Sequence, residues 1–249
     1  MARLKGLLKI EGTLDQLTFY KTKDGHLVKT KSSIAADRIA NDANFQRTRE
    51  NGSEFGNAAT AGKLVRDALR NLLATASDYR VTSRLTQLMR SIIDYDTTSA
   101  RGSRNVGVAI ANASAKALLK GFDFNINAIL GAILFKPYTL TAATGVVNIA
   151  GFVPLNDIAV PTGATHVSLV SAWAKVDFTA GTYEVQQSNI VNLPIDATST
   201  AVVLTPAAVP TGTGINLFVL EIEFFQQVNN VQYSLKNGAY NAMNIIEVS

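Results

Sequence analysis

The stretch Ile215-Asn-Leu-Phe-Val-Leu-Glu-Ile-Glu-Phe-Phe-Gln-Gln227 decides the fold class of the second half of the chain. Every second residue from Phe218 to Phe224 is large and apolar, and two is the side-chain period of a β-strand. We therefore predict a strand over 215–227 that turns this set toward a core. Glu221 and Glu223 share the opposite face, which we expect to be solvated.

Further β-prone runs fill the region that begins at Phe122, where charged residues nearly vanish and Val, Thr, Ile, Phe, Ala and Asn dominate. Turn signals such as Pro161-Thr-Gly163 and Asn229-Asn230 separate the runs. No helical pattern lies between them, so an antiparallel, Ig-like β-sandwich is favoured over a parallel sheet. The other runs lie near 128–135, 146–153, 166–178, 182–191, 200–205 and 239–248.

Upstream of Phe122 the apolar residues recur at helical spacing. Three- and four-residue steps predict an amphipathic helix over 55–72, and further helices are expected from Ser77 or Asp78 to Asp94 and over 106–119. Gly62 is expected where another element approaches closely, as is Gly56. The stripe of the first helix consists of Phe55, Ala58, Gly62, Val65, Leu69 and Leu72.

The N-terminal region is predicted to be β. Asp24-Gly25 separates two alternating runs, which is the pattern of a hairpin with a type I′ turn. Strands are expected near 6–12, 16–23 and 26–31. The chain is thus predicted to be an α+β protein: an N-terminal β-hairpin plus an α-helical region over 1–121, followed by the antiparallel β-sandwich over 122–249.

The charge of the chain is polarised between these parts. Residues 1–120 hold 20 Lys and Arg against 11 Asp and Glu, whereas residues 121–249 hold 3 against 8. A basic half is suited to nucleic acid, to an anionic surface or to the acidic half of another copy.

The basic residues gather in three places: the hairpin, the segment before the first helix, and the polar faces of the first two helices. Such density is typical of phosphate contact, but a charged stripe is also the ordinary surface of a helix. The candidate assembly or anion-contact residues are Lys21, Lys23, Lys29, Lys31, Arg47, Arg49, Lys63, Arg66, Arg70, Arg80 and Arg84.

Catalytic chemistry is poorly represented. The two histidines, His26 and His166, are predicted to be a turn and a strand residue, and neither has a partner for a triad or a metal site. The segment Gly56–Leu64 has five residues between its glycines and Leu after Lys63, which departs from the phosphate-loop pattern. We therefore expect a non-enzyme without cofactor or metal.

The compartment is left open by the sequence. The first ten residues carry Arg3, Lys5 and Lys9, so they do not form the apolar core of a signal peptide. No stretch approaches the ~20 apolar residues of a membrane span. The chain has 0 Cys, which excludes disulfides and suits both cytoplasmic residence and leaderless export.

Several short motifs resemble those of a family of uncharacterised Bacteroidota proteins. They are Gly12-Thr-Leu, Leu17-Thr-Phe-Tyr-Lys-Thr-Lys-Asp-Gly25, Arg38-Ile-Ala-Asn-Asp42 with Phe45, Arg47-Thr-Arg-Glu-Asn51 and Glu54-Phe-Gly56. The resemblance implies a hairpin, a helical segment and a C-terminal β-sandwich. It implies no activity.

Three functions follow from these observations. The leading hypothesis is a structural subunit that assembles with itself into a filament, tube, shell or surface layer through the hairpin and the oppositely charged halves. The first alternative is a nucleic-acid-associated or phage-like packaging protein that uses the basic half. The second is a carbohydrate-binding or adhesive module, which requires exposed tyrosines such as Tyr183, Tyr233 and Tyr240 at one end of the sandwich.

Overall fold

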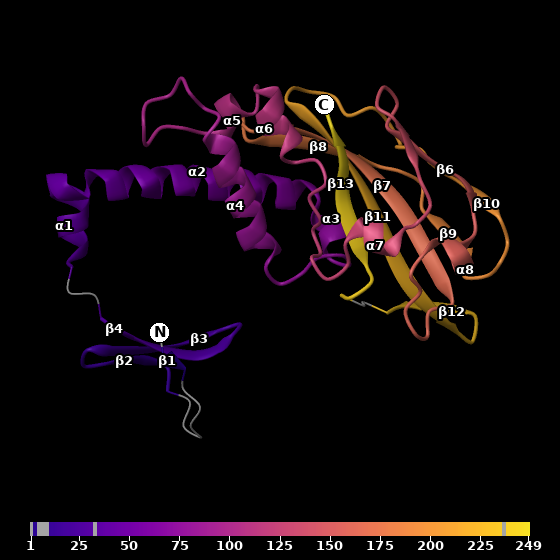
Figure 1. Cartoon of the computed structure of the whole chain (residues 1–249), viewed down its shortest axis with the longest axis horizontal. Coiled ribbons are helices and arrows are strands. Elements are labelled where there is room, and N and C mark those ends of the chain that lie inside the picture. Colours follow the sequence, from indigo (N-terminus) through magenta and orange to yellow (C-terminus); the bar gives the residue numbers. More distant parts are fainter. Residues whose placement is uncertain (1, 4–9, 32–33, 236–237) are drawn as a thin grey trace. The chain divides into compact units, whose positions relative to one another are not determined.

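The computed structural model describes residues 2–3, 10–31, 34–235 and 238–249 (Figure 1). The chain divides into two compact units, Met1–Glu50 and Asn51–Ser249, and each is described by itself. The α+β fold class is confirmed. The division falls between residues 50 and 51, whereas we expected a boundary at residue 121. The helices that follow residue 51 belong with the large sheet because they share a hydrophobic core with it.

The first unit contains a four-stranded sheet in the order β1-β4-β3-β2, and α1 (Ala36–Asn41) follows it. A 3₁₀ turn (Ala43–Phe45) then leads into α2 (Gln46–Ala68), which continues into the second unit. Of the expected strand over 6–12, residues 6–9 lie outside the described residues. The strands are β1 (Ala2–Arg3), β2 (Gly12–Leu14), β3 (Leu17–Thr22) and β4 (Gly25–Thr30).

The hairpin between β3 and β4 is confirmed, but its type I′ turn is wrong. Thr22 pairs with Gly25 and Lys21 with His26, so the two loop residues are Lys23 and Asp24. Gly25 has a φ of +115°, and Asp24 is not among the residues with positive φ. A glycine in this conformation after the loop lets the strands resume their register without steric strain. His26 lies in a strand and not in the turn.

The helices of the second unit follow the predicted apolar stripe closely. Ala58, Gly62 and Val65 of α2 are buried, whereas Phe55 is exposed. A side chain at Gly62 would lie 3.6 Å from Leu85, so the expected close approach is confirmed there, and Gly56 shows none. The other helices are α3 (Arg70–Leu73), α4 (Val81–Ile93), α5 (Val106–Ala109), α6 (Ala113–Ala117), α7 (Leu130–Ile133) and α8 (Pro154–Asp157).

The expected helix over 106–119 is divided into α5 and α6. Asn105 caps α5 by accepting a hydrogen bond from the amide of Val108, and Asn112 caps α6 by accepting one from the amide of Ser114. Asparagine side chains compete for backbone amides in this way, which starts a new helix rather than extending the first.

Two long strands organise the large antiparallel sheet. The register of β7 (His166–Asp177) with β11 (Ile215–Val228) runs from Val176 opposite Ile215 to His166 opposite Phe225. These two strands lie side by side in Figure 1. Their outer edges pair with β8 (Thr182–Gln187), β9 (Val191–Pro194), β12 (Val231–Ser234) and β13 (Ala242–Val248).

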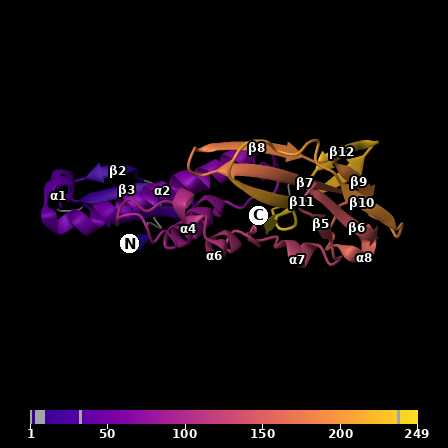
Figure 2. The same cartoon turned by 90° about the horizontal axis from the view of Figure 1, so that it is seen from above.

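A three-stranded sheet and the helices cover the two faces of the large sheet. The small sheet has the order β10 (Thr200–Leu204), β6 (Val146–Phe152) and β5 (Thr139–Thr141), and its core contains Trp173 and Phe218 from the large sheet. Residues of α2 and α4 share a second core with β7, β11 and β13. From above, α4, α6, α7 and α8 follow one side of this unit (Figure 2).

Two local predictions in this region are wrong. The run 128–135 forms the one-turn helix α7 and not a strand, and the Asp123 carboxylate accepts a hydrogen bond from the amide of Leu130, 3.0 Å away. A short apolar run is compatible with either structure, so its periodicity alone does not decide. The face that carries Glu221 is not solvated, because the helices lie on it and leave this side chain 3% exposed.

Candidate functional site

The N-terminal sheet carries an apolar face that the described residues of its own unit leave partly exposed. The strand register places Leu14, Leu17, Phe19 and Val28 on one side. Leu14 is 66% exposed, and none of residues 10–31 and 34–50 is buried. A sheet with one apolar face normally buries that face against another layer. We call this set the hairpin face.

The hairpin lysines surround this sheet. Lys21 lies opposite His26 on the side of the hairpin face, since it alternates with Phe19. Lys29 lies on the other side, with its Nζ 5.6 Å from the centre of the Tyr20 ring. Lys23 is in the turn, and Lys31 follows β4 as an exposed residue. The expected positions of these four lysines on the hairpin are therefore correct.

The two arginines after the sheet have different environments. The guanidinium of Arg49 donates hydrogen bonds to the carbonyl oxygens of Ile39 and Asp42, at 2.8 and 2.9 Å, and so joins α1 to α2. Arg47 is exposed on the first turns of α2. Backbone amide and Arg38 hydrogen bonds hold the pKa of Asp42 below its usual value. Arg49 thus has a structural role, and Arg47 remains on the surface.

The basic stripe on α2 is partly neutralised. Lys63 and Arg70 both contact Asp67, at 2.9 and 3.0 Å, and hydrogen bonds from these two side chains lower the pKa of Asp67. Both cationic side chains remain largely exposed. Arg66 is half-buried, and its Nε is buried without a hydrogen-bond partner in the described part of the chain. This surface carries less charge than its sequence indicates.

Arg84 is a structural residue and not a surface cation. Its guanidinium pairs with the buried carboxylate of Asp78 and donates a 2.7 Å hydrogen bond to the carbonyl of Asp123. It also lies 5.0 Å from the ring centre of Phe122. These contacts tie the start of α4 to the segment that leads into the sandwich. Arg80 is exposed and lies 5.1 Å from the ring centre of Tyr79.

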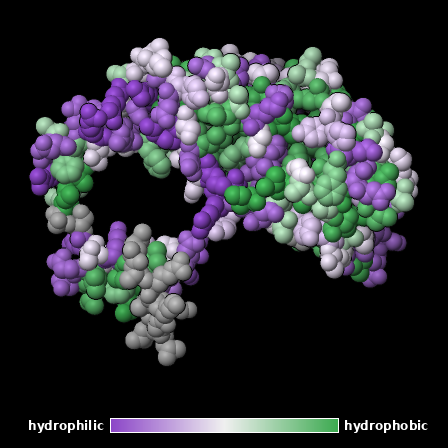
Figure 3. Space-filling model, in the orientation of Figure 1, coloured by the Kyte–Doolittle hydropathy of each residue, from purple (hydrophilic) through white to green (hydrophobic). Residues whose placement is uncertain are grey.

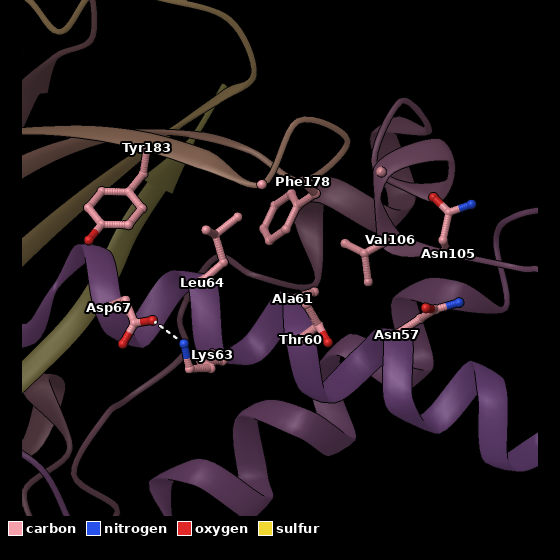
Figure 4. A pocket seen from close by; sticks show the side chains of 12 residues that line it. Asn57, Thr60, Ala61, Lys63, Leu64, Asp67, Asn105, Val106, Phe178 and Tyr183 are labelled. Carbon is pink, nitrogen blue, oxygen red and sulfur yellow. Dashed lines mark hydrogen bonds and ion pairs between the residues drawn. The ribbon is translucent and has the colours of Figure 1, made fainter.

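A pocket of about 360 Å³ lies between α2, the start of α5 and the turn between β7 and β8. In Figure 4, Leu64, Phe178 and Val106 point into this space, while Tyr183 stands above Asp67. The Lys63–Asp67 ion pair lies at its rim, and its remaining polar lining consists of amides and hydroxyls. Its size is within the range of small-ligand sites, but its charged groups are already paired.

The exposed tyrosines do not form a common platform. Tyr183 pairs with Val176 at one end of β7, whereas Tyr233 pairs with Gln226, next to the opposite end of β7. Tyr240 is half-buried and packs edge-on against Phe224, with ring centres 6.3 Å apart. A stacking surface for a sugar requires grouped rings, so this set does not provide one.

The buried carboxyl of Glu221 is the group that the sequence interpretation missed. Thr75 donates a hydrogen bond to it, and burial raises its pKa to about 8, with the nearby Glu223 carboxylate adding to the rise and the Thr75 bond opposing it. The side chain of Asn241 donates a 3.1 Å hydrogen bond to the carbonyl of Thr75 on the same side. The arrangement joins α3 to the sheet. The alternation along β11 places Glu221 on one face of the sheet. It would have predicted burial of this side chain only if the helices were known to cover that face.

Among residues 2–3, 10–31, 34–235 and 238–249, no cluster of three or more His, Cys, Asp or Glu could hold a metal ion. No helix of the described chain is long and apolar enough to cross a membrane. No protein-family model, curated protein or solved structure matches the sequence or the fold. The resemblance to the Bacteroidota family stays a prediction.

Proposed function

We propose that this protein is a non-enzymatic structural subunit that assembles with copies of itself, and that its N-terminal sheet is the connecting element. The observation that carries the proposal is the hairpin face. It presents four large apolar side chains on a unit in which no described residue from 10 to 50 is buried. Covering such a face on association removes apolar surface from water, which is the main driving force of most protein contacts.

The edges of the same sheet add to this argument. The short strand β2 (Gly12–Leu14) is an edge strand, and its partner β3 lies on one side of it. Edge strands expose unpaired amides and carbonyls, which are suited to pairing with another chain. The polarised charge of the chain supports contact between unlike surfaces of two copies. A contact between two different surfaces propagates into a ring or an open polymer.

The test is the assembly state of the full chain over a range of NaCl concentrations, measured by light scattering and negative-stain electron microscopy. Leu17→Asp places a charge on the hairpin face, and Thr18→Asp places one at the next position, on the opposite side of the sheet. We expect the wild type and Thr18→Asp to assemble and Leu17→Asp to remain monomeric. A wild-type monomer at every concentration, or normal assembly of Leu17→Asp, contradicts the proposal.

Nucleic-acid binding is the second candidate function, and the exposed side chains of Lys63 and Arg70 favour it. Asp67 between them lowers the local positive charge. Binding to duplex DNA through phosphates weakens steeply with salt. The logarithm of the binding constant falls with the logarithm of the salt concentration, with a slope of roughly −0.9 per neutralised phosphate. Fluorescence anisotropy of a labelled duplex measures this slope. A Lys63→Ala/Arg70→Ala variant that binds with an unchanged slope removes this candidate surface.

A further inference from the structure

We infer that the surface that receives the hairpin face of a neighbouring copy is an apolar patch around α7 and α8, formed by Ile126, Ile129, Phe135 and Leu155. We call this set the α7–α8 patch. The inference rests on the proposed self-assembly and names the second of the two surfaces that it requires.

Hydrogen bonds hold α7 and α8 next to each other. The amide of Phe135 donates to the carbonyl of Asp157 at 2.8 Å, and the amide of Ala159 donates to the carbonyl of Ile133 at 2.9 Å. Leu130 and Ile133 point into the core of the sandwich. The backbone is therefore held in place and presents the remaining side chains outward. Because this surface is already ordered, binding a partner costs it little conformational entropy.

The members of the patch are large, apolar and exposed. Phe135 is 59% and Leu155 is 55% exposed, and Ile129 and Ile126 are exposed to a similar degree. Apolar surface gathers over α7 and α8 in the space-filling view (Figure 3). A group of exposed apolar side chains on neighbouring elements commonly marks an interaction site.

The exposed acidic residue Asp196 borders the patch, whereas the hairpin face is bordered by a cation. The amide of Leu155 donates to the carbonyl of Asp196 at 3.1 Å, so the exposed Asp196 lies next to Leu155. Asp157 belongs to α8 itself, but it pairs with Lys136 at 3.4 Å and adds no net charge to the rim. Lys21 lies on the side of the hairpin face. The two surfaces therefore match in two respects: both are apolar at the centre, and their rims carry opposite charges.

A second exposed apolar group occurs at the turn between β11 and β12, where Val228, Val231 and Tyr233 are exposed. The segment 226–235 carries no acidic residue, and the neighbouring carboxylate of Glu223 is half-buried and accepts a hydrogen bond from Ser234. It therefore lacks the charge complement of the hairpin face, and we assign the contact to the α7–α8 patch. This turn supplies the matched control for the experiment.

The chain has 0 Cys, so single introduced cysteines report contacts without interference. The experiment mixes a Leu14→Cys variant with a tagged Phe135→Cys variant of different mass under assembling conditions, then oxidises the mixture and separates it on a non-reducing gel. The control replaces Phe135→Cys with Val231→Cys, which has comparable exposure. We expect the mixed-mass band from Leu14→Cys with Phe135→Cys to exceed the control band at least ~10-fold, because disulfides require Cα atoms within about 7 Å.

Point variants separate this inference from the proposed function. We expect Phe135→Asp to abolish assembly and Val231→Asp to leave it unchanged. Assembly by Phe135→Asp, or a control band as strong as the Phe135→Cys band, overturns the α7–α8 assignment while self-assembly stands. A band that contains only Leu14→Cys copies would show that two hairpin faces pack together, which also overturns it. A wild type that remains monomeric overturns both.

Discussion

The hydroxyl of Thr75 donates a hydrogen bond to the carboxyl of Glu221, which lies 146 residues later in the chain. Thr75 follows α3, and Glu221 is in the middle of β11, opposite Val170 on one side and Met243 on the other. This bond, together with the one that the Asn241 side chain donates to the carbonyl of Thr75, joins the helical layer to the sheet. Because Glu221 is 3% exposed, its protonation state is coupled to folding.

The first prediction concerns the pH dependence of stability. The pKa of Glu221 is about 8 in the folded protein, against 4.5 for an ordinary glutamate, so the folded state holds an additional proton between these values. The contribution of Glu221 to the free energy of unfolding is fully present below pH 4.5 and is lost as pH rises toward 8. Over this range the free energy of unfolding should fall by up to about 1.4 kcal/mol per pH unit. Urea denaturation at several pH values measures the slope.

Glu221→Gln should remove that slope, because an amide keeps an acceptor for Thr75 and does not ionise. We expect it to be more stable than the wild type at pH 8, by roughly 2–4 kcal/mol. Glu223→Gln is the matched control two residues along the same strand. It should retain most of the slope, because burial raises the pKa of Glu221 more than the Glu223 carboxylate does. An unchanged slope in Glu221→Gln would show that another group titrates.

The second prediction concerns Asp96, whose carboxylate organises the loop before α5. It accepts hydrogen bonds from the amides of Thr98, Ser99 and Asn105, at 3.2, 2.9 and 3.1 Å. These bonds outweigh the opposing effect of burial and hold the pKa of Asp96 well below 3.8. We expect Asp96→Ala to cost roughly 2–4 kcal/mol at pH 7, since several bonds to a charged acceptor are lost.

The low pKa gives this prediction a second readout. The stabilisation by Asp96 is present above pH 3.8 and is lost as pH falls toward the lower folded value. The difference in unfolding free energy between the wild type and Asp96→Ala should therefore shrink below about pH 4. Asp94→Ala removes an exposed carboxylate that pairs with Arg90 and should cost under about 1 kcal/mol. Equal costs for the two variants would contradict the assigned role of Asp96.

The third prediction concerns Arg84. Replacing it by Met removes the ion-pair partner of a buried carboxylate and two hydrogen bonds to the carbonyl oxygens of Asp123 and Phe124. We expect a loss of roughly 3–5 kcal/mol in the free energy of unfolding. Arg70→Met removes one exposed ion pair and should cost under about 1 kcal/mol. If Arg84→Met is as stable as Arg70→Met, the network around Asp78 does not hold α4 in place.

The fourth prediction compares two glycines that both have positive φ. Gly214 has a φ of +101°, and an added Cβ would lie 2.2 Å from the carbonyl oxygen of Val176. Gly212 has a φ of +89° with open space around it. Gly212→Ala should cost about 1–2 kcal/mol from backbone strain alone, whereas Gly214→Ala adds a steric clash at the first pair of the β7–β11 ladder and should cost more than about 3 kcal/mol. Thermal unfolding compares them directly, and similar melting temperatures would exclude the clash.

The strand positions could be predicted because their signals are local. Alternation from Phe218 to Phe224 and the parity of Trp173 with Leu169 depend only on neighbouring residues, and the structure buries all of these side chains. The Asp24-Gly25 signal likewise located the hairpin. The apolar run at 128–135 failed because a buried strand and a short helix have the same composition there.

The environments of single charged residues could not be predicted in the same way. Arg84 lies on a helix opposite an apolar stripe, which is typical of a surface residue, but Asp123 and Phe124 cross above it and accept its hydrogen bonds. Glu221 is buried because α3 lies over its face of the sheet. Both outcomes depend on segments about 40 to 146 residues away, and an alternation pattern contains no information at that range. The hairpin face also needed the structure, because only its exposure distinguishes an uncovered layer from a core.

The position of β13 has a consequence for synthesis of the protein. Met243 and Ile245 complete the core beneath the helices, and Ala242 and Ile246 complete the core of the sandwich. β11 also needs β7 on one side and β13 on the other before its backbone is paired. Neither core can close while residues 242–248 are still inside the ribosome. The nascent second unit therefore exposes its apolar strands until residues 242–248 emerge, so we expect it to engage holdase chaperones up to that point.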